Sequence, residues 1–204
     1  MIEASAIVLA GGQSRRLGRD KTQLRINGKT LLARAVERLA ALCPEVIIAT
    51  NSPDRHAHPL ARCVTDVFPG KGVLGGIYSG LAAATLPRAI VVAVDMPFLN
   101  DDLLAYLVSL APGYDVVAPV IEHHVEPLHA VYGVTCLPAM RESLLAAPAP
   151  RIISFYPDVH VRQVTREEVA RFDPELLSLF NINSLDDIER ARAILQQRGL
   201  DFDA

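Results

Sequence analysis

Short apolar segments alternate with amphipathic ones along the first part of the chain. Four segments are apolar throughout and rich in β-branched residues, and they cover residues 4–9, 46–50, 89–94 and 116–119. Strands that are buried on both faces have this composition, because helices cover both sides of a parallel sheet. The pattern therefore predicts a parallel sheet in the interior of the protein.

The segments between these strands have helical periodicity or the composition of a buried helix. Leu32, Val36 and Leu39 recur on one face of a helix, with polar residues elsewhere. Asn100 directly precedes another helical segment, where it is a favourable N-cap residue. The expected helices cover residues 30–41, 76–84 and 101–110. Strands that alternate with helices predict βαβ units and an α/β, Rossmann-like fold with a mostly parallel sheet and helices on both faces.

The second half of the chain has a less regular pattern. An extended segment is expected at residues 126–132, after a turn at His123 and His124. Ser184 has Asp187 three residues later, which is a capping-box pattern for the start of a last helix at 184–197. A further helix is expected at 136–146 and a half-exposed strand at 159–164. No repeat or linker divides the chain, which predicts a single domain over residues 1–204.

Composition narrows the class of protein. The net charge of −3 argues against a broad nucleic-acid or membrane surface. The three cysteines, Cys43, Cys63 and Cys136, are scattered, which disfavours a disulfide framework or a zinc site. No apolar stretch approaches the roughly 20 residues that span a bilayer, and the first residues lack the basic start of a signal peptide. We therefore expect a soluble, cytoplasmic protein.

The segment of residues 9–21, with the sequence LAGGQSRRLGRDK, directly follows the first expected strand. Its glycines allow the backbone to approach a phosphate closely, and its cations suit a triphosphate. The glycines are Gly11, Gly12 and Gly18, and the cations are Arg15, Arg16, Arg19 and Lys21. The segment is neither a Walker A loop nor a GxGxxG dinucleotide motif. A flexible turn with solvated arginines is the alternative, and the number of glycines and cations favours the nucleotide site.

Asp95 ends a very apolar strand in the sequence VDMPF. A carboxylate in such a place is costly to bury without a cation or a hydrogen-bond donor. Coordination of Mg²⁺ is one explanation, and an Asp that caps the turn before Pro97 is the other. The residue alone does not separate the two. The glycine-rich segment at the same edge of the sheet favours the metal.

Together these motifs resemble the molybdenum cofactor guanylyltransferase family. The matching parts are LAGGQSRRLGRDK, Asn51 after the second strand, Asp66 in TDVFPGKGVLGGI, VDMPF, and a late FNINS segment. The resemblance extends over residues 7–194. It implies a GT-A-like nucleotidyltransferase that moves GMP from GTP to molybdopterin with Mg²⁺, with a nucleotide-binding half at about 1–100 and an acceptor-binding half at about 101–204. It also implies other cofactor-biosynthesis proteins or apo-molybdoenzymes as partners.

The resemblance also implies roles for single residues. Leu9, Ala10 and Gly11 would line the nucleotide site, Asn51 and Asp66 would lie near the guanosine, and Asp95 would hold Mg²⁺. Lys21, with Arg15 or Arg16, would stabilise the leaving pyrophosphate. Gly12 bears on the base, because guanylyl members carry LAGG where cytidylyl relatives carry LAAG. Asn181 and Asn183 either place an oxygen near the metal or are turn residues before Ser184.

The acceptor side departs from the family pattern, because Glu126-Pro127-Leu128-His129 stands where a His-Pro pair is expected. His129 is expected to be a structural histidine with its hydrogen bonds satisfied. Arg151 is either an acceptor contact or a plain exposed arginine. The glycines at 70, 72, 75 and 76 shape a substrate-facing loop or allow tight helix packing, with the loop preferred. No role is assigned to His56, His58, His123 or His124.

Three other functions stay open from the sequence. The first is a CTP-dependent molybdopterin cytidylyltransferase or another small-molecule nucleotidyltransferase. The second is a nucleotide-binding adaptor without turnover, which the presence of both Lys21 and Asp95 disfavours. The third is a dinucleotide-dependent reductase, which is disfavoured because Asn51 stands where an acidic residue would bind the ribose.

Overall fold

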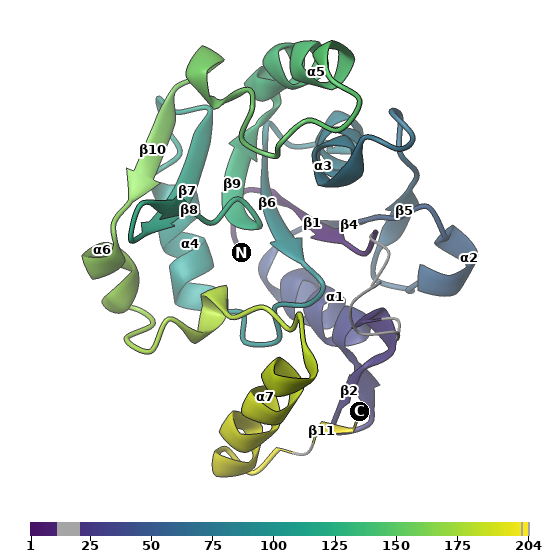
Figure 1. The fold of residues 1–204 in the computed structure, drawn as a ribbon, viewed down its shortest axis with the longest axis vertical. Helices are drawn as coiled ribbons and strands as arrows, with labels where there is room; N and C mark the ends of the chain where they lie inside the picture. The colour runs from purple at the N-terminus through teal and green to yellow at the C-terminus, as the bar shows by residue number, and fades with distance from the viewer. Residues whose placement is uncertain (12–20, 201, 204) are drawn as a thin grey trace.

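The computed structural model describes residues 1–11, 21–200 and 202–203 (Figure 1). Its main sheet has eight strands. They are β1 (Ser5–Leu9), β4 (Glu45–Ala49), β5 (Arg62–Val64), β6 (Arg88–Ala93), β7 (Val116–Ile121), β8 (His124–Val125), β9 (His129–Gly133) and β10 (Val161–Val164). The order is β10-β7-β9-β6-β1-β4-β5, with β8 paired to β7. A second sheet joins β2 (Arg25–Ile26), β3 (Lys29–Thr30) and β11 (Phe202–Asp203).

The centre of the main sheet is parallel, and this determines where the site lies. Strand β1 pairs in parallel with β4 and β6, and Leu9 is in register with both Ala49 and Ala93. The carboxyl ends of these strands therefore meet at one edge of the sheet. Strand β9 runs antiparallel to both β6 and β7. Its direction was not part of the prediction from the sequence, whereas the mostly parallel α/β fold is confirmed.

Helices cover both faces of the sheet (Figure 1). They are α1 (Leu31–Leu42), α2 (Pro53–His56), α3 (Gly72–Ala83), α4 (Asp101–Ser109), α5 (Leu137–Ala146), α6 (Arg166–Ala170) and α7 (Leu185–Gln197). Short 3-10 turns are η1 (Lys21–Gln23), η2 (Val134–Cys136), η3 (Tyr156–Asp158) and η4 (Leu177–Leu179). Among the described residues, no helix has the length and apolar character needed to cross a membrane.

Alternate residues of β1 face two separate cores, as a strand buried on both sides requires. Ala6 and Val8 pack in the core that contains the buried faces of α1, α4 and α7. Ile7 and Leu9 pack in the core with α3 and α5. Helix α3 approaches the sheet closely at Gly80, where a Cβ would lie 2.7 Å from Ile7 Cγ2. These contacts explain why the strand is apolar on both faces after Ser5.

The helix starts agree with the sequence pattern because capping is a local interaction. Asn100 accepts a hydrogen bond from the backbone N–H of Leu103 at the start of α4. Ser184 and Asp187 form a complete capping box at the start of α7. Thr30 caps α1 through its side chain. Helix α3 begins at Gly72, four residues before the start predicted from its apolar run.

Candidate functional site

A cavity of about 710 Å³ opens at the carboxyl edge of β1, β4 and β6. Seven of the residues predicted for the nucleotide site line it: Leu9, Ala10, Gly11, Lys21, Asn51, Asp66 and Asp95. Gly12 and Arg15, which were predicted with them, lie outside the described residues, as do Arg16, Gly18 and Arg19. The cavity lies where an open α/β sheet places its ligands.

Lys21 lies at the centre of the polar contacts in this cavity. Its Nζ donates to Asp95 Oδ2 and to Asn183 Oδ1, both at 2.7 Å. The side chains of Lys21 and Asp95 are only 16% and 17% exposed, so water screens this ion pair weakly. The contact joins η1 to the residue just beyond β6. Asp95 therefore holds the ammonium group of Lys21 in place, and Lys21 also lines the cavity.

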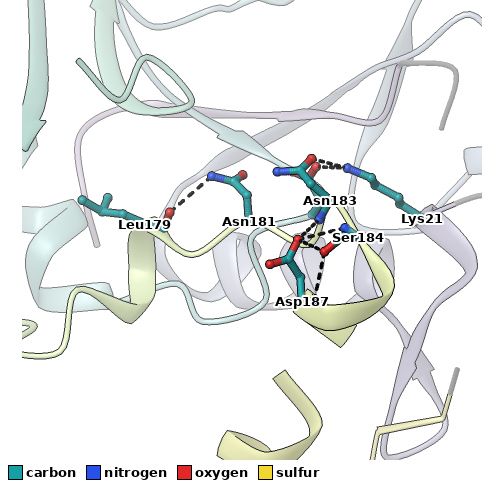
Figure 2. Close-up of polar contacts among 7 residues, drawn as sticks. Lys21, Leu179, Asn181, Asn183, Ser184 and Asp187 are labelled. Atoms are coloured by element: carbon teal, nitrogen blue, oxygen red, sulfur yellow. Dashed lines mark hydrogen bonds and ion pairs between the residues drawn. The ribbon is translucent and has the colours of Figure 1, made fainter. Parts of the chain in front are cut away.

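The segment before α7 completes this side of the site (Figure 2). The backbone N–H of Ile182 donates to the carbonyl oxygen of Asp95 at 3.0 Å, which fixes the segment against the end of β6. Asn183 places its amide oxygen on Lys21, and its backbone N–H donates to Asp187 Oδ2 at 2.9 Å. Asn181 instead donates to the carbonyl oxygen of Leu179 at 3.2 Å. Asn183 is thus a site residue that the sequence left undecided.

Asn51 and Asp66 form a reciprocal pair that also lines the cavity. Asn51 Nδ2 donates to Asp66 Oδ2 at 2.6 Å, and the backbone N–H of Asp66 donates to Asn51 Oδ1 at 3.1 Å. Asn51 follows β4, and Asp66 follows the short strand β5, which the apolar pattern did not predict. The pairing of β5 with β4 brings the two residues together. Both side chains are solvent-accessible within the cavity wall.

Glycines shape the cavity wall between Asp66 and α3. Gly70 and Gly72 have φ values of +78° and +65°, a region that side chains disfavour. Both line the cavity, together with Gly76 and Val73. A Cβ at Gly76 would make only ordinary contacts, with Leu9 at 3.5 Å. Gly70 and Gly72 therefore fit the preferred expectation of a substrate-facing loop. Gly75 fits the alternative of tight packing, because a Cβ there would lie 3.2 Å from the carbonyl oxygen of Phe68.

Glu126 is a charged neighbour of the site that the sequence left without a role. Its side chain accepts a hydrogen bond from the backbone N–H of Leu128, a cavity residue, at 3.0 Å. Burial raises the pKa of Glu126, and the negative charge of Asp95 raises it further. A glutamate just before the apolar strand β9 is a signal that could have marked it in the sequence. Arg151 is exposed and is not among the described cavity residues, so its suggested acceptor contact gains no support.

His129 is a buried residue of β9, directly after Leu128, and it is 0% exposed. Neither ring nitrogen has a hydrogen-bond partner among the described residues. The prediction that His129 is a buried structural residue is confirmed. The prediction that its ring is hydrogen-bonded is wrong, because the ring packs among apolar strands. Burial lowers the pKa of His129 to about 4, against a weaker opposing effect of Asp173.

This depressed pKa predicts a pH dependence of stability. An unfolded histidine titrates near pH 6.5, so between pH 6.5 and 4 the unfolded chain binds a proton that the folded chain excludes. The contribution of His129 is therefore complete above pH 6.5 and is lost as the pH falls, by about 3 kcal/mol in total. Urea unfolding between pH 4.5 and 7 should show this slope.

The matched variants for this measurement are His129→Leu and His124→Ala, the second at an exposed histidine. His129→Leu should flatten the slope between pH 6.5 and 4, whereas His124→Ala should keep it. Parallel loss of stability in the wild type and in His129→Leu would contradict the assignment.

Comparisons with known proteins agree with this geometry. Residues 6–162 match the MobA-like NTP transferase domain. The chain is 35% identical over 196 residues to a probable molybdenum cofactor guanylyltransferase of Pelotomaculum thermopropionicum, covering 96% of this chain and 95% of that protein. It is 40% identical to a protein of the same description from Chloroflexus aggregans, covering 94% of each.

A solved structure is similar over nearly the whole chain. Molybdopterin-guanine dinucleotide biosynthesis protein A from Archaeoglobus fulgidus superposes with a TM-score of 0.84 at 27% identity, covering 95% of this chain and 99% of that one. The family expected from the motifs is therefore confirmed. On its sequence, its fold and the placement of its cavity, the chain belongs to the MobA-like NTP transferase family.

Proposed function

We propose that this protein transfers GMP from GTP to molybdopterin, forming the guanine dinucleotide cofactor and releasing pyrophosphate. One observation carries the proposal: Lys21 and Asp95 are paired in the same cavity that the Asn51–Asp66 pair lines, and Asn183 contacts Lys21. The cavity thus offers a charged wall for phosphates and a hydrogen-bonding wall for a base. The relatives from Pelotomaculum and Chloroflexus are described as probable molybdenum cofactor guanylyltransferases, which supports the same reaction for this protein.

The base is placed on the side of Asn51 and Asp66. Within the described part of the chain, the side chain of Asp66 bonds to Asn51 through Oδ2 alone, which leaves Oδ1 for a ligand. Guanine presents two adjacent N–H donors, which suit a carboxylate, whereas cytosine presents one amino group. This argument favours GTP over CTP independently of Gly12, which lies outside the described residues. Leu9, Ala10 and Gly11 line the path from the base toward Lys21.

The residues of the site fit Mg²⁺ that arrives with the nucleotide. Asp95 Oδ1 has no hydrogen bond or ion pair with the described residues, and the amide oxygen of Asn183 lies nearby on Lys21. The described residues contain no group of three or more His, Cys, Asp or Glu that could hold a metal alone. One carboxylate combined with substrate phosphates is a usual environment for Mg²⁺. When bound, the ion would withdraw negative charge from the phosphate oxygens.

The reaction needs no covalent intermediate with the protein. A phosphate oxygen of the acceptor attacks the α-phosphorus of GTP in line, and pyrophosphate leaves with the bonding electron pair. No Ser, Cys or His is among the described residues that line the cavity, which supports direct transfer. Lys21 balances the charge that develops on the leaving pyrophosphate, and the walls align the reactants. We place Glu126 and Leu128 on the acceptor side of the cavity. The protein partners and the cytoplasmic location expected from the sequence belong to this proposal as well.

The direct test is release of pyrophosphate by the purified protein with Mg²⁺, using GTP or CTP, each with and without molybdopterin. We expect release that requires the acceptor, with kcat/KM for GTP at least roughly 10²-fold above that for CTP. A preference for CTP would keep the mechanism and reject the base assignment. Binding of nucleotide without release under any condition would favour a non-catalytic adaptor.

A further inference from the structure

Three buried polar side chains contact one another in sequence at the edge of the cavity. His56 Nδ1 lies 2.6 Å from Thr50 Oγ1, and His56 Nε2 lies 3.3 Å from Thr22 Oγ1. The three residues are 5%, 2% and 4% exposed, respectively. Buried polar groups of this kind are costly unless they bond to one another. These contacts therefore link two segments that are far apart in the sequence.

The two threonines lie beside the two parts of the proposed nucleotide site. Thr22 is in η1 and directly follows Lys21, and Thr50 directly follows β4 and precedes Asn51. Both threonines line the cavity, whereas His56 does not. His56 thus connects the backbone that carries the phosphate-side cation with the backbone that carries the base-side amide.

The position of the imidazole is itself fixed. His56 ends α2, which packs beside β5 (Figure 1). The single S–H of Cys63 in β5 lies within weak hydrogen-bond reach of two carbonyl oxygens of α2, those of Pro53 at 3.9 Å and His56 at 3.8 Å. The backbone N–H of His56 donates to the carbonyl oxygen of Ser52 at 3.2 Å. These backbone contacts place α2 so that the ring of the buried His56 lies between the two threonines.

A neutral imidazole suits both contacts. Thr50 Oγ1 already accepts a hydrogen bond from the backbone N–H of Ser52 at 3.0 Å, so its hydroxyl proton is free to be donated to His56 Nδ1. Nε2 then carries the ring proton and donates it to Thr22 Oγ1. Phenylalanine would fill the same space without either contact. Glutamine places a polar group near the position of Nε2, and asparagine near that of Nδ1.

We propose that His56 is a positioning residue that sets the spacing between Lys21 and Asn51 in the nucleotide site. The inference rests on the proposed function, because it assigns the two walls to the phosphates and the base of one nucleotide. Loss of the link releases η1 from β4, and Lys21 then no longer meets the phosphates while the base is bound. Small misplacements of this kind cost large factors in rate, up to roughly 10²-fold for about 1 Å.

The test compares His56→Phe, His56→Gln and His56→Asn with the control His58→Ala, a histidine of the same segment that lines no part of the cavity. Binding of GTP is measured by calorimetry without acceptor, and kcat and KM are measured with it. We expect His56→Phe to weaken GTP binding and lower kcat/KM by roughly 10- to 100-fold. His56→Gln should recover most of this loss, His56→Asn little, and His58→Ala should match the wild type.

A second substitution keeps the test decisive if His56→Phe folds poorly. Thr22→Val removes the same link from the other side, and combining it with His56→Phe should cost less than the sum of the two single effects, because both break the contact between His56 and Thr22. A lower melting temperature with wild-type kcat/KM in all His56 variants would mean a purely structural role and overturn the proposal. Absence of GTP binding and turnover in the wild type would overturn the proposed function and this role with it.

Discussion

Asp95→Asn is expected to lower kcat/KM for GTP by roughly 10²- to 10³-fold, with the fold intact. The carboxylate lies at the end of β6 in the cavity, mostly buried and paired with Lys21 at 2.7 Å. Asparagine keeps the shape and an oxygen that can accept from Lys21, so the packing should survive. It removes the negative charge that would attract Mg²⁺, which is the reason for the large loss.

The measurement is steady-state pyrophosphate release over a range of Mg²⁺ concentrations, together with thermal unfolding. The Mg²⁺ concentration that gives half-maximal activity should be higher for Asp95→Asn than for the wild type. A packing defect would not produce this shift. Asp102→Asn, an exposed carboxylate of α4, is the matched control and should behave as the wild type. Near-normal rates and an unchanged Mg²⁺ requirement in Asp95→Asn would reject its assigned role.

Lys21→Met is expected to lower kcat by roughly 10²-fold, because it would remove the cation that we propose to stabilise the leaving pyrophosphate. Methionine retains much of the apolar stem, so loss of charge dominates loss of packing. Arginine should rescue activity only in part, since its planar fork differs in shape from the compact ammonium group that donates to both Asp95 and Asn183. Single-turnover kinetics with saturating GTP would measure the chemical step directly.

The same substitution tests the ion pair. Lys21→Met leaves the mostly buried Asp95 without its cation, which is destabilising. The double variant Lys21→Met with Asp95→Asn should therefore be more stable than Lys21→Met alone. Lys29→Met, at an exposed lysine paired with Glu37, should change neither kcat nor stability by a comparable amount. Equal stability of the single and double variants would show that the pair is not coupled in the folded protein.

Several parts of the site were predictable because they follow from local chemistry. The runs that became β1, β4 and β6 are apolar on both faces beyond their first residue, since both of their faces are covered. Parallel strands bring their carboxyl ends to one edge, so Gly11, Asn51 and Asp95 could be expected together. The helix caps at Asn100 and Ser184 were predictable for the same reason, because a cap depends on a few adjacent residues.

Other elements carry too little local signal. Strands β2 and β11 have two residues each, and Phe202 pairs with Ile26 only because the chain returns there. Strand β5 has three residues of mixed polarity and depends on β4 for its partner. Without β5, the sequence offered no reason for Asp66 to meet Asn51. Such short strands are stabilised by pairing rather than by their own pattern.

The sequence by itself determined the α/β class, the order of the principal strands and helices, and the edge of the sheet that holds the site. These properties depend on periodicity, capping and chain direction, which are properties of neighbouring residues. Only the tertiary structure decided that Asn183 contacts Lys21 across 162 positions, that His56 links Thr22 to Thr50, and that His129 is buried without hydrogen bonds. Contacts between distant residues depend on how whole elements pack, which no local pattern records.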